Sequence, residues 1–73
     1  MVSDDRRAEL KLLGARVKEL RQAAGCTQQE VADAIGVNRV TVARFEAGAH
    51  DLGVSRLRGL AAVLAVDPGA FWE

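Results

Sequence analysis

The chain has 73 residues, of which 49% are hydrophobic and 27% are charged, and its formal net charge is zero. A chain of this length buries only about 60% of the surface that its unfolded form exposes, so it forms one small domain. Its balance of apolar and charged residues is typical of a globular protein and excludes a disordered tail. The single cysteine, Cys26, cannot form a disulfide within the chain, which favours a reducing compartment.

Neither a membrane-spanning segment nor an export signal is expected. No run of residues is long and apolar enough to span a bilayer, and the start, MVSDDRRAEL, lacks the apolar core of a signal peptide. We therefore expect a cytoplasmic protein with no membrane partner.

Charge is unevenly distributed along the chain. Residues 6–21 carry six Lys or Arg against two Glu, whereas residues 27–51 carry two Arg against four acidic residues. A net charge of zero argues mildly against a nucleic-acid partner, since such binders are often strongly basic. The local excess still allows a basic first helix to contact phosphates.

Helical periodicity dominates, and strand signals are nearly absent. The first predicted helix spans residues 9–24, and Gly25 is expected to end it as a left-handed cap. One apolar stripe runs along it: Leu10, Leu13, Val17, Leu20 and Ala24. We assign residues 1–8 to an N-terminal segment that can be flexible, and residues 9–73 to the folded domain.

The second predicted helix has a strong start signal. Thr27 and Glu30 have the spacing of a capping box, in which each side chain satisfies a backbone N–H group of the other residue. Gly36 is expected to end this helix after about two turns, the left-handed cap being a common helix end.

Asn38 is expected to cap the third helix, and Gly48 to close it. Val37 and Val42 have the positions of a hydrophobic staple across its start. The link around Gly36 is so short that the second and third helices should meet at a sharp angle.

A fourth helix is expected after the loop of residues 49–53, with one apolar face: Val54, Leu57, Leu60, Ala61 and Leu64. Asp67 and Pro68 then form an N-cap followed by proline at the first helical position, which predicts a short fifth helix through Phe71 and Trp72. The predicted fold is therefore all-α, a bundle of five helices.

The third helix has two faces with different properties. Val42 and Phe45 can be buried, whereas the other face gathers two arginines among small or apolar residues: Arg39, Val40, Ala43, Arg44 and Ala47. The arginines could be ordinary solvated charges. However, small neighbours such as Ala43 and Ala47 let the helix approach another surface closely, which favours a binding face.

The combination of these motifs resembles the helix-turn-helix family of Cro and the phage repressors, also called the xenobiotic-response-element type. The resemblance covers roughly residues 10–71. It rests on T-Q-x-E-x-A at 27–32, Gly36, the apolar positions 37 and 42, R-F-E-x-G at 44–48, and L-x-x-L-A-x-x-L-x-V at 57–66.

The resemblance implies a sequence-specific DNA-binding transcriptional regulator whose recognition helix, about residues 38–47, lies in the major groove of double-stranded DNA. The positions that it assigns to base reading are Asn38, Arg39, Val40 and Arg44. Those that we assign to phosphate contact and positioning are Thr27, Gln28 and Thr41. The resemblance also implies an ion pair between Arg21 and Glu46 that joins the first helix to the third.

Two features depart from the family pattern. The loop after Gly48 reads A-H-D-L-G, where the family often has basic residues and a proline that contact phosphate. The predicted groove face also has few hydrogen-bonding groups besides Asn38, Arg39 and Arg44. This departure argues against phosphate contact by this loop, and direct base readout would be sparse.

One recognition helix reaches only a few base pairs, so we expect a homodimer that reads a palindromic operator. The fourth helix and the C-terminal turn should supply its interface, with Leu64, Phe71 and Trp72 as candidates, although Phe71 and Trp72 could instead cap the core. The alternative function is a protein-interaction module, such as an antitoxin subunit or a transcription cofactor.

No catalytic or metal site is predicted. Cys26 is expected to be packed as a small hydrophobe, and His50 has no second metal ligand near it in the sequence. With one histidine and one cysteine, an enzyme is improbable, and we expect neither a metal nor another cofactor.

Overall fold

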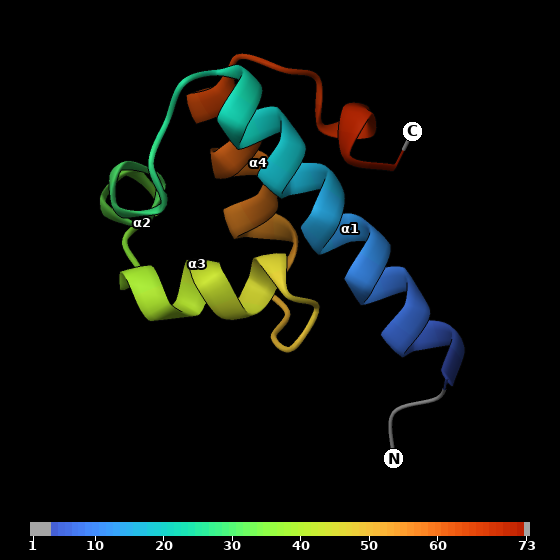
Figure 1. The fold of residues 1–73 in the computed structure, drawn as a ribbon. Coiled ribbons are helices and arrows are strands. Elements are labelled where there is room, and N and C mark those ends of the chain that lie inside the picture. Colours follow the sequence, from blue (N-terminus) through green and yellow to red (C-terminus); the bar gives the residue numbers. More distant parts are fainter. Residues whose placement is uncertain (1–3, 73) are drawn as a thin grey trace.

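The computed structural model describes residues 4–72, which form helices joined by short loops, with no strand among them (Figure 1). Four are α-helices: α1 (Asp4–Ala23), α2 (Gln28–Ile35), α3 (Arg39–Glu46) and α4 (Val54–Leu64). The fifth element, η1 (Pro68–Trp72), is a 3-10 helix. The prediction of an all-α fold is confirmed, but the prediction of five α-helices is wrong.

The α1 helix starts earlier than predicted. It begins at Asp4, so residues 4–8 of the segment that we expected to be flexible are helical, while residues 1–3 lie outside the described residues. Within the predicted stripe, Leu13 and Val17 are buried. Ala24 is exposed because the helix has already ended at Ala23, and Gly25 follows in the left-handed conformation with φ 73°.

The predicted ends of α2 and α3 are confirmed. At the start of α2, Thr27 and Glu30 form the complete capping box, and Gly36 caps the other end with φ 75°. Asn38 caps α3 through its side chain, which accepts a hydrogen bond from the Thr41 backbone N–H. These signals are local in sequence, so they fix the boundaries without knowledge of the packing.

The predictions for α4 and the C-terminal turn need correction. Val54 was expected on the buried face but is 68% exposed, since it is the first residue of α4 and lies beyond the core. In η1 the Ala70 N–H donates to the carbonyl of Asp67, three residues back, at 2.9 Å. A five-residue segment is too short to establish the wider α-helical pattern, and short end segments commonly take the 3-10 form.

The core lies where α1, α2, α3 and α4 converge, and Phe71 closes it from η1. Figure 1 looks nearly along α2 while α3 lies across the view, so these two helices meet at a steep angle, as predicted. α3 forms one edge of the molecule, and one of its sides is left uncovered. Among the described residues no helix is long and apolar enough to cross a membrane, and no group of three potential metal ligands occurs.

Candidate nucleic-acid interface

The two faces of α3 differ in burial as the sequence suggested. Val42, Phe45 and Glu46 are buried against the rest of the molecule. The opposite face is open to solvent except at the half-buried Ala43, and its exposed residues are Arg39, Val40, Arg44 and Ala47. Val40, a hydrophobic residue, is 50% exposed at the centre of this face. We call these five residues, with Ala43 included, the open face of α3.

The two arginines of the open face are available for a ligand. Within residues 4–72, neither Arg39 nor Arg44 has a hydrogen-bond or ion-pair partner on the protein. Each guanidinium carries five N–H donors in a planar fork that suits bidentate contact with paired acceptors. Because the neighbouring Ala43 and Ala47 are small, a flat or grooved partner can come close enough to meet both forks.

Asn38 and Thr41 are tied to each other at the start of α3. The Asn38 Oδ1 accepts two hydrogen bonds from Thr41, one from its backbone N–H at 2.8 Å and one from its hydroxyl at 3.0 Å. This oxygen is therefore engaged in capping. The side-chain amide N–H groups of Asn38 remain the donors that it can offer to a ligand.

At the start of α2, Thr27 and Glu30 form reciprocal hydrogen bonds between side chain and backbone. The Thr27 hydroxyl oxygen accepts from the Glu30 backbone N–H at 3.0 Å, and the Glu30 carboxylate accepts from the Thr27 N–H at 3.0 Å. Hydrogen bonding of the Glu30 carboxylate, first by the Thr27 backbone N–H and then by the Thr27 side chain, holds the pKa of the Glu30 carboxyl below its ordinary value. The Thr27 hydroxyl can rotate to donate to an acceptor such as phosphate.

Arg21 and Glu46 join α1 to the end of α3 through a bidentate ion pair. The Arg21 Nε lies 2.7 Å from the Glu46 Oε2, and the other arm of the guanidinium lies 3.0 Å from Oε1. Both residues are only 7% exposed. The third guanidinium nitrogen donates to the carbonyl of Cys26 at 2.9 Å. The hydrogen bonds to Glu46 raise the pKa of Arg21 above its ordinary value, so the guanidinium stays charged.

Gln28 extends this pair to α2. Its side-chain nitrogen donates to the Glu46 Oε1 at 3.0 Å, and the residue is half-buried. Sequence reasoning assigned Gln28 to phosphate contact and missed this bond. A side-chain amide has two N–H donors, so one remains for a ligand. Glu46 thereby connects three helices, and the start of α2 is held in a fixed relation to the open face.

Close backbone packing places α1 against the end of α3. Gly14 of α1 faces α3 so closely that a Cβ at this position would lie 2.2 Å from the carbonyl oxygen of Phe45. Gly48, just beyond α3, faces Lys11 of α1 in the same way, with 2.8 Å between such a Cβ and the Lys11 Cα. The open face is therefore carried on a helix with little freedom to shift.

Two of the three residues proposed for a dimer interface lie inside the domain. Leu64 is 5% exposed and Phe71 is 2% exposed, because both side chains complete the core of the chain itself. They are therefore unsuited to direct contact with a partner. Trp72 is 55% exposed, and the nearby Leu12 of α1, which was not among the predicted interface residues, is 74% exposed. Both line one shallow recess of about 600 Å³.

Comparison with known proteins places these features in a family. Residues 12–70 match the family described as the helix-turn-helix domain. The HTH-type transcriptional regulator y4wC of Sinorhizobium fredii is 31% identical over 61 residues, which cover 84% of this chain and 43% of that protein. The HTH-type transcriptional regulator R00410 of Rhizobium meliloti is 26% identical over 61 residues, 84% of this chain and 44% of that protein.

The chain thus spans less than half the length of these curated relatives. Among solved structures it is similar to the restriction-modification controller protein C.AhdI from Aeromonas hydrophila, with a TM-score of 0.86 and 31% sequence identity. That match covers 92% of this chain and 97% of the controller protein. The family match over most of the domain and the close structural likeness lead to one conclusion: the chain belongs to the helix-turn-helix family of the Cro and phage-repressor type.

Proposed function

We propose that the chain is a sequence-specific DNA-binding transcriptional regulator that inserts the open face of α3 into the major groove. The observation that carries this proposal is the open face itself, where Arg39 and Arg44 are unpaired within the described residues and flanked by small side chains. The names of the relatives, transcriptional regulators and a controller protein, point in the same direction.

Each residue of the open face has a role in this proposal. Arg39 and Arg44 are long enough to reach base edges, and the planar fork matches the O6 and N7 acceptors of guanine, a contact worth about 1–3 kcal/mol of discrimination. Val40 packs on a thymine methyl group. Ala43 and Ala47 keep the helix close to the bases, and Asn38 offers its amide N–H groups beside them.

The start of α2 positions the domain on the DNA backbone. Free N–H groups at a helix N-terminus suit a phosphate, and such contacts fix register without reading sequence. Thr27 contributes its hydroxyl, and Gln28 contributes the N–H that it does not give to Glu46. Thr41, whose hydroxyl is already bonded to Asn38, acts by holding the start of α3 in place.

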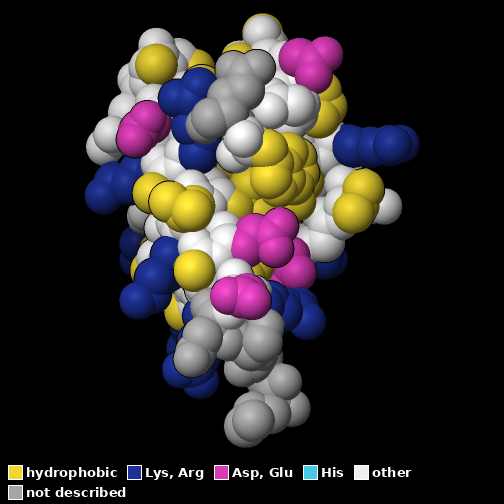
Figure 2. Space-filling view, turned by 90° about the vertical axis from the view of Figure 1, so that its right-hand side faces the viewer, with side chains coloured by type: hydrophobic (Ala, Val, Ile, Leu, Met, Phe, Trp, Pro, Cys, Tyr) yellow, Lys and Arg dark blue, Asp and Glu magenta, His cyan; other side chains and the backbone are white. Residues whose placement is uncertain are grey.

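We further propose that two copies act together on a palindromic operator. A two-fold dimer presents two recognition helices to half-sites about 34 Å apart. Figure 2 shows the side of the molecule where α1 and the C-terminal turn lie, with hydrophobic side chains gathered near its centre. Trp72 and Leu12 are exposed here, and aromatic residues are enriched in interface cores. In this proposal Leu64 and Phe71 support the surface from beneath.

Selection from a random pool of duplex DNA tests the DNA-binding proposal. We expect the 73-residue chain to enrich a defined duplex, and Arg44→Ala to lose most of the affinity for it while keeping the fold. A chain that enriches no duplex would contradict the proposal. It would favour the alternative role, a protein-interaction module such as an antitoxin subunit or a transcription cofactor.

Sedimentation tests the dimer. We expect self-association of the wild-type chain at micromolar concentration, weakened by Trp72→Glu. Val63→Glu is the matched control, because Val63 is a 40% exposed hydrophobic residue on α4. A monomer at high micromolar concentration, with and without the selected duplex, would contradict the dimer.

A further inference from the structure

The structure sorts the six basic residues of the first helix into different environments. Arg21 is buried in its pair with Glu46, and Arg16 donates to the carbonyl of Ala70 at 3.0 Å and pairs with Glu19. Lys18 is exposed and lies seven residues after Lys11 along α1. The three remaining residues, Arg6, Arg7 and Lys11, all line one recess beside residues 48–51.

This recess adjoins the C-terminal end of the recognition helix. Its other wall is the loop that directly follows α3, with Gly48, Ala49, His50 and Asp51. Lys11 lies so close to this loop that a Cβ at Gly48 would be 2.7 Å from the Lys11 Cγ and 2.8 Å from its Cα. In Figure 1 the N-terminal half of α1 extends past this loop, beyond the C-terminal end of α3.

Acidic and basic side chains are separated around this part of α1. Asp5 and Glu9 line recesses on the side of Trp72, whereas Arg7 and Lys11 line the recess at the loop. Arg7 and Lys11 are four residues apart, so their Cβ atoms lie about 5–6 Å apart on one face of the helix. Both are exposed, and neither has a partner among the described residues.

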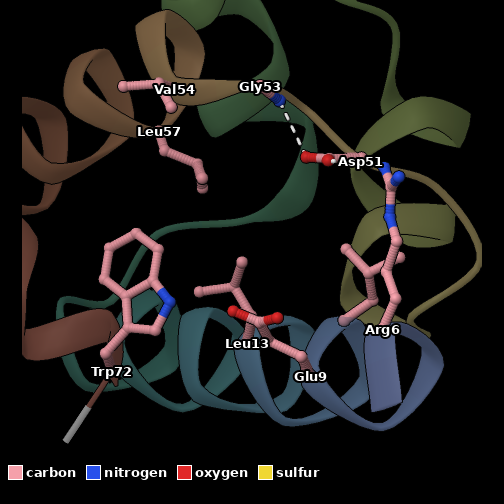
Figure 3. Close-up of a pocket in the computed structure, with 9 residues that line it drawn as sticks. Arg6, Glu9, Leu13, Asp51, Gly53, Val54, Leu57 and Trp72 are labelled. Carbon is pink, nitrogen blue, oxygen red and sulfur yellow. Dashed lines mark hydrogen bonds and ion pairs between the residues drawn. The ribbon is translucent and has the colours of Figure 1, made fainter. Parts of the chain in front are cut away.

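Asp51, the acidic residue of this loop, pairs with Arg6, the third basic residue of the recess. Arg6 reaches from α1 towards Asp51, with 3.4 Å between a guanidinium nitrogen and the carboxylate (Figure 3). Asp51 also accepts a hydrogen bond from the Gly53 N–H at 2.9 Å, which holds its carboxylate at the loop. Asp51 is thus engaged by Arg6 and by Gly53, and no ion pair joins it to Arg7 or Lys11 among the described side chains.

We propose that Arg7 and Lys11 form a phosphate-binding ledge that grips the DNA backbone beyond the C-terminal end of the recognition helix. The inference rests on the proposed function, since it requires α3 to lie in the groove. The ledge gives α1 the phosphate contact that the loop, with its acid at Asp51, cannot make by itself. It also explains how a chain with zero net charge attracts a polyanion, because its cations are concentrated where the backbone passes.

The salt dependence of binding tests the ledge. Each phosphate contact contributes about 0.9 to the slope of log affinity against log salt concentration. The probe is the duplex enriched from the random pool. We expect Arg7→Gln with Lys11→Gln, which removes both charges and keeps a polar side chain at each position, to lower the magnitude of the slope by about 1.8 per protomer, with equal losses on all operator variants. The charge-retaining pair Arg7→Lys with Lys11→Arg should keep the wild-type slope.

A second double variant removes the same charge elsewhere. Lys18→Gln with Arg58→Gln changes exposed cations outside the recess and should leave the slope unchanged.

Ethylation of single phosphates adds a positional readout: wild type should show interference at phosphates flanking the α3 contact, and the Arg7 and Lys11 variant should lose that interference alone. An unchanged slope with retained interference, or an equal loss in the Lys18 and Arg58 variant, would overturn the ledge while leaving the proposed function intact. Failure of wild type to bind any duplex would overturn both.

Discussion

Glu46 is a charged residue that is almost entirely buried and accepts three hydrogen bonds. Two come from Arg21 and one comes from Gln28, so both carboxylate oxygens are occupied. Charge-assisted, bidentate bonds of this kind offset much of the desolvation cost of a buried ion pair. The stability of the pair therefore depends on all partners being present.

Removing one partner of this network should cost more than removing both. Arg21→Met leaves the Glu46 carboxylate buried with only Gln28, and we expect a loss of about 3–5 kcal/mol in the free energy of unfolding. Replacing both residues, Arg21→Met with Glu46→Met, should recover a large part of that loss. Urea denaturation measures the effect. If Arg21→Met and Glu46→Gln each leave the midpoint unchanged, the pair has no structural role.

The capping box of α2 predicts a specific pH dependence. The pKa of Glu30 in the folded chain lies below its ordinary value of 4.5, so the ionised carboxylate stabilises the fold. This contribution is complete above pH 4.5 and is lost as the pH falls through the lower, folded-state pKa. We expect Glu30→Gln to be less stable than wild type at pH 7 and the difference to vanish in acid. A difference that grows in acid would contradict the assigned direction.

Residue by residue, the sequence located local partners better than distant ones. Thr27 with Glu30 and Asn38 with Thr41 lie three residues apart, so their spacing alone indicates contact. Gln28 and Glu46 lie eighteen residues apart, and only the folded arrangement brings the amide to the carboxylate. The Arg21–Glu46 pair, which lies twenty-five residues apart, was expected only through the family resemblance, and the bond from Gln28 was not expected at all.

At the scale of the elements, α1 packs closely against α3 because Gly14 has no side chain. Gly14 lies within a helix, where alanine would normally be favoured by about 1 kcal/mol. It nevertheless has to be glycine, because a Cβ would lie 2.2 Å from the Phe45 carbonyl oxygen and 2.8 Å from that of Glu46. Both contacts are with backbone, which cannot rotate away as a side chain can.

Two Gly→Ala substitutions should therefore have opposite effects. We expect Gly14→Ala to destabilise the domain and to weaken DNA binding, since α3 must shift. Gly59→Ala in α4 should stabilise it by about 0.5–1 kcal/mol, because the new Cβ would meet only the Ile35 Cγ2 at an ordinary 3.9 Å. Thermal melts of both variants measure the contrast. Stabilisation by Gly14→Ala would show that the backbones of α1 and α3 can separate enough to admit a Cβ, which would contradict their close packing.

The element boundaries were predictable where a cap marks them. The start of α1 was not, because residues 5–9 are all exposed and contribute nothing to an apolar stripe. Asp5 does favour a helix N-terminus through the helix dipole, but that signal is weak in a charged segment. At η1, Asp67 and Pro68 indicate that a helical turn begins, but they do not distinguish an α-helical turn from the 3-10 form that short end segments commonly take.

At the scale of the whole molecule, the distribution of charge and of exposed apolar surface decides what the fold can bind. Zero net charge conceals a separation in which Arg7 and Lys11 face the loop after α3 while Asp5 and Glu9 face Trp72. Composition alone could not reveal it. The same limit explains why Leu64 and Phe71 were predicted at the interface although both are buried. Without the packing, a hydrophobic residue near the C-terminus is equally compatible with a core position and with an interface position.

The central claim is that the open face of α3 reads bases while the start of α2 holds phosphate. A binding matrix of Arg39→Ala, Arg44→Ala and Gln28→Ala against single-base variants of the selected duplex tests it most directly. We expect each arginine variant to lose preference at particular guanines, by about 1–3 kcal/mol. Gln28→Ala should weaken binding to every duplex alike, with its urea midpoint measured in parallel to separate loss of phosphate contact from loss of the bond to Glu46. Uniform losses for the arginine variants would reduce them to phosphate contacts, and unchanged binding would contradict the placement of this face in the groove.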